Sequence, residues 1–178
     1  LESDAAYSNN TLANANPLEL RASGVNTVAQ VAGVVMASEG STADVDTYLI
    51  GYLKTGSTVT LTLNYPDGST LSGTVQLLDD AGKVVAEGPD GSLTRLLSAD
   101  GRYYARVLAN SGSGIYGSYI LDLSVADRTF PQVVAVNGLP VPGGISDVPL
   151  YRFDVVVDKE LAADSVRGDA FELRHAGR

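Results

Sequence analysis

Residues 100–125 read DGRYYARVLANSGSGIYGSYILDLSV, and this stretch decides the fold class. An Asp-Gly turn leads into an alternating segment that contains Tyr103 and Tyr104, and a glycine-rich linker then leads into a second alternating segment, Tyr119–Val125. Alternation with a period of two places successive side chains on opposite faces of a β-strand. The stretch therefore predicts two strands that form the closing hairpin of an all-β sandwich.

Similar segments recur upstream at a spacing of about 8 to 12 residues. The clearest is Thr58–Tyr65, in which Val59, Leu61 and Leu63 share one face and threonines occupy the other. Further strands are expected at 25–37, 47–53, 71–78, 83–87 and 93–97, with turns of Gly, Pro, Asp and Ser between them. Because no long amphipathic helix interrupts them, we expect a jelly-roll-like antiparallel β-sandwich over residues 1–127, preceded by a polar, Asn-rich arm at 1–16.

The pattern changes after Asp127. Residues 128–178 contain an apolar, proline-containing segment and then an alternating strand expected over Pro149–Val157. These strands are too few to close a sandwich, so we expect a partial immunoglobulin-like (Ig-like) β unit. Either its remaining strands have been cut away, or its strands pack on the first domain.

The amino-acid composition disfavours several classes of function. The 178 residues carry a net charge of −9 and no cysteine. Nucleic acids and anionic membranes are disfavoured as partners because both need clustered Lys and Arg. The lack of cysteine excludes disulfides, zinc–thiolate sites and a cysteine nucleophile. The sequence contains no run of about 18 apolar residues, so no transmembrane helix is expected. Since the chain begins with Leu1 and shows no signal peptide, we expect an internal or processed fragment.

Five short motifs stand in order along the first unit. They are Asn9-Asn10-Thr11 followed by Ala13 and Ala15, Asp44-Val45-Asp46-Thr47-Tyr48, Leu78–Gly82, Gly101–Val107 and Tyr119–Val125. In order and spacing, residues 1–127 resemble the pre-peptidase C-terminal domains of bacteria. Residues Pro131–Leu173 are similar, over a shorter pattern, to bacterial Ig-like repeats.

The resemblance implies a β-sandwich appended to secreted proteases and other extracellular enzymes. An extracellular or cell-surface location is therefore expected, with other domains of the same polypeptide as partners. Some relatives, the collagen-binding domains of clostridial collagenases, bind calcium through the N-terminal arm and collagen on one sheet face. The resemblance thus also implies an extracellular protein or polysaccharide as a partner.

Calcium is the one cofactor that the residues suggest, since it takes six to eight oxygen ligands. The candidate metal ligands are Asn9, Asn10, Asp44 and Asp46, with Glu2, Asp4 or Glu39 as additional oxygen donors. In an extended chain, two aspartates spaced two residues apart point to the same side. The calcium-binding relatives carry two glutamates before the Asn pair, where this chain has Ala5 and Tyr7. The alternative is that the asparagines form turns by bonding to their own backbone.

No catalytic constellation is visible. The single histidine, His175, lies three residues from the end of the chain, a poor place for a catalytic base that must be held by packing. The adjacent Asp79 and Asp80 lie at a turn, where aspartate is favoured for conformational reasons, so they are better explained as turn formers than as an acid–base pair. We expect that the chain is not an enzyme.

The positions of the tyrosines distinguish two remaining hypotheses about function, a binding module and an accessory module. Tyr103 and Tyr104 point to opposite faces, so one is expected in the core and the other exposed or at an edge. An aromatic patch could be extended by Tyr48, Tyr52, Tyr65, Tyr116 and Tyr119. An exposed tyrosine cluster would favour a calcium-assisted module that binds collagen-like protein or polysaccharide. A polar Thr/Ser face would favour a non-catalytic accessory module for folding support, spacing or attachment.

Overall fold

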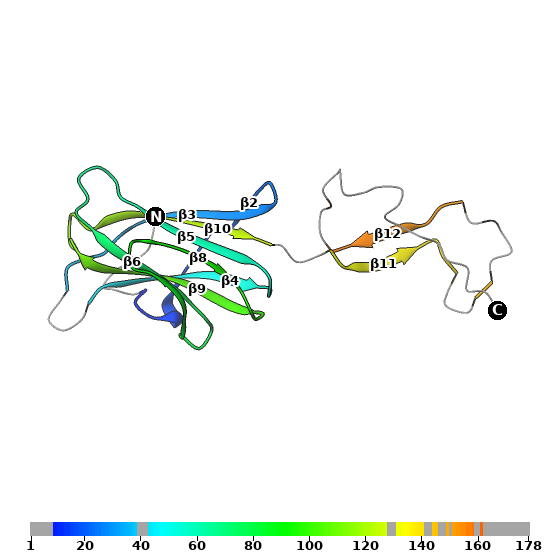
Figure 1. The fold of residues 1–178 in the computed structure, drawn as a ribbon, viewed down its shortest axis with the longest axis horizontal. Coiled ribbons are helices and arrows are strands. Elements are labelled where there is room, and N and C mark those ends of the chain that lie inside the picture. The colour runs from blue at the N-terminus through cyan, green and yellow to red at the C-terminus, as the bar shows by residue number, and fades with distance from the viewer. Residues whose placement is uncertain are drawn as a thin grey trace. The chain divides into compact units, whose positions relative to one another are not determined.

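A computed structural model describes residues 9–38, 43–127, 131–140, 144–145, 149, 151–158 and 161. The chain forms two compact units, Leu1–Thr129 and Phe130–Arg178, and each is described by itself. Figure 1 shows the strands of the first unit stacked in layers and the strands β11 and β12 in the second. That residues 1–127 belong to the pre-peptidase family and 128–178 to the Ig-like family stays a prediction.

The first unit is a sandwich of two five-stranded sheets. Sheet A has the order β1 (Asn16–Pro17), β4 (Val45–Leu53), β9 (Gly101–Ser111), β6 (Ser72–Leu78) and β7 (Val84–Gly88). Sheet B has the order β2 (Arg21–Ser23), β3 (Asn26–Val34), β10 (Ser118–Ala126), β5 (Thr58–Asn64) and β8 (Ser92–Leu96). All pairings are antiparallel except β1 with β4. The predicted all-β antiparallel sandwich is confirmed.

The core lies between the two sheets and is built from the alternating apolar positions. On β5, Val59, Leu61 and Leu63 are all buried, as their spacing predicted. Leu61 pairs with Leu123 on β10, so their side chains lie on the same inner face. Burying a leucine or valine side chain contributes roughly 1.5–3 kcal/mol, and this term holds the two sheets together.

The expected closing hairpin is wrong. β9 pairs with β4 and β6 in sheet A, whereas β10 pairs with β3 and β5 in sheet B. The linker between them carries Gly112, Gly114 and Gly117, and the first two have positive φ angles of 79° and 85°. A Cβ on Gly112 would lie 1.9 Å from a backbone oxygen, so the linker needs glycine to cross from one sheet to the other. Two neighbouring strands therefore face each other across the core instead of pairing edge to edge.

One tyrosine of the pair, Tyr103, lies in the core as expected, but Tyr104 is neither exposed nor at an edge, because it is buried on the central strand β9. Tyr103 belongs to the main core, whereas Tyr104 lies on the outer face of sheet A and pairs with the buried Leu78. The 3₁₀ turn η1 (Leu12–Asn14) contacts β4, and a Cβ on Gly82 would lie 3.3 Å from Leu12 Cδ1. The N-terminal arm thus reaches from β4 to the turn between β6 and β7.

The short strands β1 and β2 were not expected from the sequence. β1 adds to the edge of β4, where Asn16 pairs with Tyr48, and β2 adds to the edge of β3. Neither short strand shows the alternation that identifies the longer ones, and each forms because a sheet edge offers free backbone groups.

In the second unit, β11 (Val133–Asn137) and β12 (Asp154–Val157) form a two-stranded antiparallel sheet. The strand expected from Pro149 begins only at Asp154, and Tyr151 is almost fully exposed. A hairpin of two strands buries little apolar surface by itself. Across the described parts of both units, no helix is long and apolar enough to cross a membrane.

Candidate functional site

The four candidate calcium ligands come together where the N-terminal arm meets β4. Asn9 Nδ2 donates to Asp46 Oδ1 at 3.3 Å, and the Asn9 carbonyl accepts the backbone N–H of Thr47 at 3.2 Å. Asn10 Oδ1 accepts the backbone N–H of Val45 at 3.0 Å. The Asn10 amide also donates to the carbonyl oxygen of Ala43 at 3.1 Å. The asparagine pair therefore ties the arm to the start of β4.

Asp46 carries its carboxylate into the core between the sheets. The Tyr119 hydroxyl on β10 donates to Asp46 Oδ2 at 2.5 Å, and it lies 2.6 Å from the Tyr48 hydroxyl. All three side chains are at most 1% exposed. A buried carboxylate is costly unless donors surround it, and here the donors come from the arm and from the opposite sheet. This network links sheet A, sheet B and the arm at one end of the sandwich.

A calcium ion would need free oxygen donors at this junction. Asp44 Oδ2 accepts the backbone N–H of Met36 at 2.5 Å, and the Asp46 carboxylate accepts from Asn9 and Tyr119. Among the described residues, no group of three or more His, Cys, Asp or Glu side chains could hold a metal. One atom does fit a ligand role, because the buried Asn9 Oδ1 has no partner there. The possible extra ligands Glu2, Asp4 and Glu39, like Ala5 and Tyr7, lie outside the described residues.

The tyrosines do not form the patch considered above. Tyr48 and Tyr119 are buried in the Asp46 network and cannot contribute to an exposed surface. Tyr52, Tyr65 and Tyr116 are exposed, and the Tyr65 hydroxyl accepts the backbone N–H of Gly73 at 3.1 Å. A face built from all five tyrosines is therefore excluded.

The outer face of sheet B is instead polar. Side chains pair across neighbouring strands, with Thr60 Oγ1 3.1 Å from Thr94 Oγ1 and Thr62 Oγ1 3.4 Å from Ser92 Oγ. Asp122 on β10 accepts from Gln30 Nε2 on β3 at 2.7 Å and from Asn64 Nδ2 on β5 at 2.6 Å. A carboxylate is thus fixed in the middle of the face by an amide on each side.

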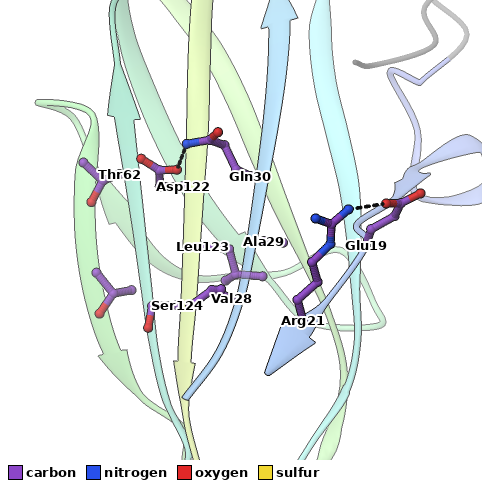
Figure 2. Close-up of a pocket in the computed structure, with 10 residues that line it drawn as sticks. Glu19, Arg21, Val28, Ala29, Gln30, Thr62, Asp122, Leu123 and Ser124 are labelled. Carbon is purple, nitrogen blue, oxygen red and sulfur yellow. Dashed lines mark hydrogen bonds and ion pairs between the residues drawn. The ribbon is translucent and has the colours of Figure 1, made fainter. Parts of the chain in front are cut away.

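A groove of about 570 Å³ runs over this face, and we call it the sheet B groove. Figure 2 shows the Gln30–Asp122 pair on one side and the Arg21–Glu19 pair on the other. The Arg21 and Glu19 side chains join at 3.2 Å and are both largely exposed. Small side chains form the floor between the two pairs, namely Val28, Thr60 and Ser124. The depression exists because long side chains flank a row of short ones.

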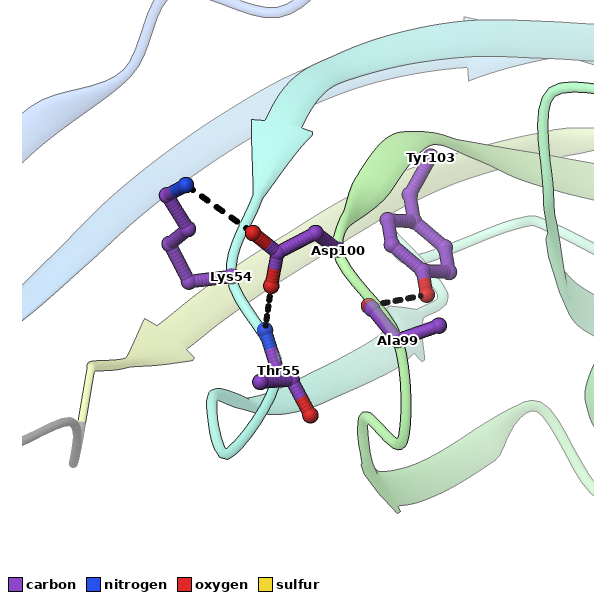
Figure 3. Close-up of polar contacts among 5 residues, drawn as sticks. All are labelled: Lys54, Thr55, Ala99, Asp100 and Tyr103. Carbon is purple, nitrogen blue, oxygen red and sulfur yellow. Dashed lines mark hydrogen bonds and ion pairs between the residues drawn. The ribbon is translucent and has the colours of Figure 1, made fainter.

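A third polar cluster closes the opposite end of β4 (Figure 3). Asp100 accepts from the backbone N–H of Thr55 at 2.8 Å and from Lys54 Nζ at 2.9 Å. These two donors, the backbone N–H first, lower the pKa of Asp100, and the carboxylate in turn raises the pKa of Lys54. The Tyr103 hydroxyl donates to the Ala99 carbonyl at 2.8 Å, and burial raises its pKa. These contacts brace two loops.

Asp79 has the turn role that its position predicted. Its Oδ1 accepts the backbone N–H groups of Ala81 and Lys83 at 3.0 and 2.9 Å. His175 lies outside the described residues.

The buried tyrosine–carboxylate network was missed at the level of sequence, although a signal for part of it was present. Asp46, Tyr48 and Ile50 are in phase on β4, so an inward-facing carboxylate could have been inferred from the alternation. Its tyrosine partner on β10 is 73 positions away, and no local pattern joins them.

Comparisons with known proteins show a distant structural likeness. No protein-family profile matches the chain, and no curated protein matches it. Among solved structures, it is similar to PliG of Aeromonas hydrophila, described as a periplasmic lysozyme inhibitor of g-type lysozyme. The TM-score is 0.43 at 17% sequence identity, over 63% of this chain and 94% of that one.

Proposed function

We propose that this chain is a non-catalytic accessory module of a secreted or cell-surface bacterial multidomain protein, where it provides folding support, spacing or attachment. The observation that carries the proposal is the polar outer face of sheet B, on which Asp122 is held by Gln30 and Asn64. A stable sandwich with such a hydrophilic, self-paired face suits a domain that stands in water between others.

The use of the ionisable groups supports a non-catalytic role. Asp46 binds a tyrosine and an asparagine, Asp100 holds a loop, and Asp79 forms a turn. An acid or base of an enzyme must instead reach a substrate from a cleft. The net charge of −9 fits a protein that stays dispersed outside the cell.

Fractionation of the producing cells tests this proposal. An antibody raised against the chain should detect it in the medium or on the cell surface, in a polypeptide larger than 18.5 kDa. Detection of an 18.5 kDa protein confined to the cytoplasm would reject the proposal.

A second candidate is a calcium-assisted binding module for collagen-like protein or polysaccharide. The buried, unpartnered Asn9 Oδ1 beside Asp46 favours it, because a carbonyl oxygen next to a carboxylate is a pair that calcium accepts. Asn9, Asn10, Asp44 and Asp46 would hold the ion, which would fix the arm to β4. Calorimetric titration of the full chain with CaCl₂ should then release heat and raise the unfolding temperature, and Asp44→Asn should weaken both. No heat and an unchanged melting curve would reject the calcium site.

A further inference from the structure

We infer that the sheet B groove binds a neutral polysaccharide chain. This inference rests on the proposed attachment role and gives it a ligand class. The groove is an open depression of about 570 Å³, a size within the usual range for small-ligand sites. Its length runs over β3, β10 and β5, between the Arg21–Glu19 pair and the Gln30–Asp122 pair (Figure 2).

The polar groups of the groove are held in place before any ligand arrives. Each oxygen of the Asp122 carboxylate accepts one amide hydrogen, from Gln30 or from Asn64. A carboxylate has about four acceptor positions, so it can still accept from a ligand, and each amide retains a second hydrogen and a carbonyl oxygen. The hydroxyls of Thr60 and Ser124 add groups that donate or accept. Fixed donors that alternate with fixed acceptors match the hydroxyl groups of a sugar, because each hydroxyl can both donate and accept a hydrogen bond.

Charge favours a neutral ligand. Arg21 and Glu19 compensate each other, which leaves Asp122 as the one uncompensated charge among the groups that line the groove. The whole chain carries nine excess negative charges. An anionic polymer would therefore be repelled, and a neutral chain avoids this penalty.

Backbone pairing disfavours an extended peptide as the occupant. β3 already pairs with β2 and β10, and β10 with β3 and β5, so the strands under the groove have no open edge. A peptide that adds to a sheet needs such an edge for its main-chain hydrogen bonds. The groove offers side-chain contacts alone, which are the contacts that sugars use.

A titration of the isotope-labelled full chain, followed by amide chemical shifts, tests the inference. The probes are cellohexaose, laminarihexaose and maltohexaose. At least one should shift the amide signals around Gln30, Thr60 and Asp122. Gln30→Ala and Asp122→Ala should each weaken that binding by about tenfold, since each removes a hydrogen-bonding group in contact with the ligand.

Gln76→Ala is the matched control, because Gln76 donates to Glu87 at 2.5 Å in an equivalent amide–carboxylate pair on sheet A. It should leave sugar binding unchanged. If none of the three sugars shifts groove signals, or if Gln76→Ala weakens binding as much as Gln30→Ala, the inference is wrong. Tighter binding of polygalacturonate than of the neutral sugars would overturn it as well. If a groove variant does not fold, the inference is judged from the chemical-shift changes of the unmutated chain alone.

The two proposals can fail separately. A chain found on the cell surface that binds no neutral sugar would reject the groove ligand and keep the accessory role. A cytoplasmic chain would reject the accessory role whatever the titration shows.

Discussion

Replacing Tyr119 with phenylalanine removes one hydroxyl from the buried network at the arm end of the sandwich. That hydroxyl donates to Asp46 Oδ2 at 2.5 Å and lies 2.6 Å from the Tyr48 hydroxyl. The ring remains, so the packing of the core is preserved and the change isolates the hydrogen bond. Asp46 is fully buried, and water cannot replace the missing donor without opening the sandwich.

The expected loss follows from the nature of the acceptor. A hydrogen bond to a carboxylate contributes roughly 1.5–3 kcal/mol, and a neutral one roughly 0.5–1.5 kcal/mol. We therefore expect Tyr119→Phe to lower the free energy of unfolding by about 2–3 kcal/mol. Tyr103→Phe is the matched control, because its hydroxyl donates to the neutral Ala99 carbonyl at 2.8 Å, and it should cost about 1 kcal/mol.

Urea unfolding followed by circular dichroism measures both variants against the unmodified chain. The slope of free energy against urea should stay the same, so that the midpoints report stability directly. If Tyr119→Phe costs no more than Tyr103→Phe, the Asp46 carboxylate does not depend on this donor, and the linking role of the network is refuted.

Three further changes test other parts of the structure. Gly88→Ala would place a Cβ 2.0 Å from a backbone oxygen of β8 and should lower the stability by several kcal/mol or prevent folding. In Gly24→Ala the new Cβ meets no atom within 4 Å, so this variant should lose only about 1 kcal/mol, because of its positive φ. Thermal melts compare the two variants, and equal losses of stability would contradict the close approach at Gly88. Asn9→Ala should cost about 1–3 kcal/mol and speed hydrogen exchange in the arm, and unchanged exchange would show that the arm is held elsewhere. Lys54→Met should raise the pKa of Asp100 only part of the way to its ordinary value, because the hydrogen bond from the Thr55 backbone N–H remains. Carbon-13 NMR measures this pKa, and full recovery would show that the lysine alone lowers it.

The sign of the Asp100 effect follows from its lowered pKa. Because the folded chain holds this proton less tightly than the unfolded chain, the contact stabilises the fold above the ordinary pKa of aspartate. That contribution is lost as the pH falls through the lowered folded-state value. Lys54→Met should therefore make the fold less sensitive to acid over this interval.

Local patterns predicted the strands well and their partners poorly. The face of β5 that carries Val59, Leu61 and Leu63 is buried as expected, since alternation follows from strand geometry itself. The hairpin of residues 100–125 was wrong because alternation does not say which edge a strand uses. A linker with three glycines can turn a strand back onto its neighbour or carry it across to the other sheet.

The candidate site, too, was predicted only in part from the sequence. The grouping of Asn9, Asn10, Asp44 and Asp46 at one end was expected from a resemblance, and the structure does bring them together. The role of Tyr119 was not expected, because it depends on a contact between two sheets. The sheet B groove could not be seen either, since its walls and floor come from four separate segments.

The amino-acid sequence alone determined the all-β class, the strand positions and the acidic, cysteine-free character of this protein, because these properties depend on composition and on nearest neighbours along the chain. Only the tertiary structure decided that strands β9 and β10 face each other across the core, that Tyr104 is buried on the outer face of sheet A, and that Asp46 is held by a tyrosine of the opposite sheet. Each of these depends on contacts between residues distant in the chain, and such contacts are selected by the packing of the whole sandwich.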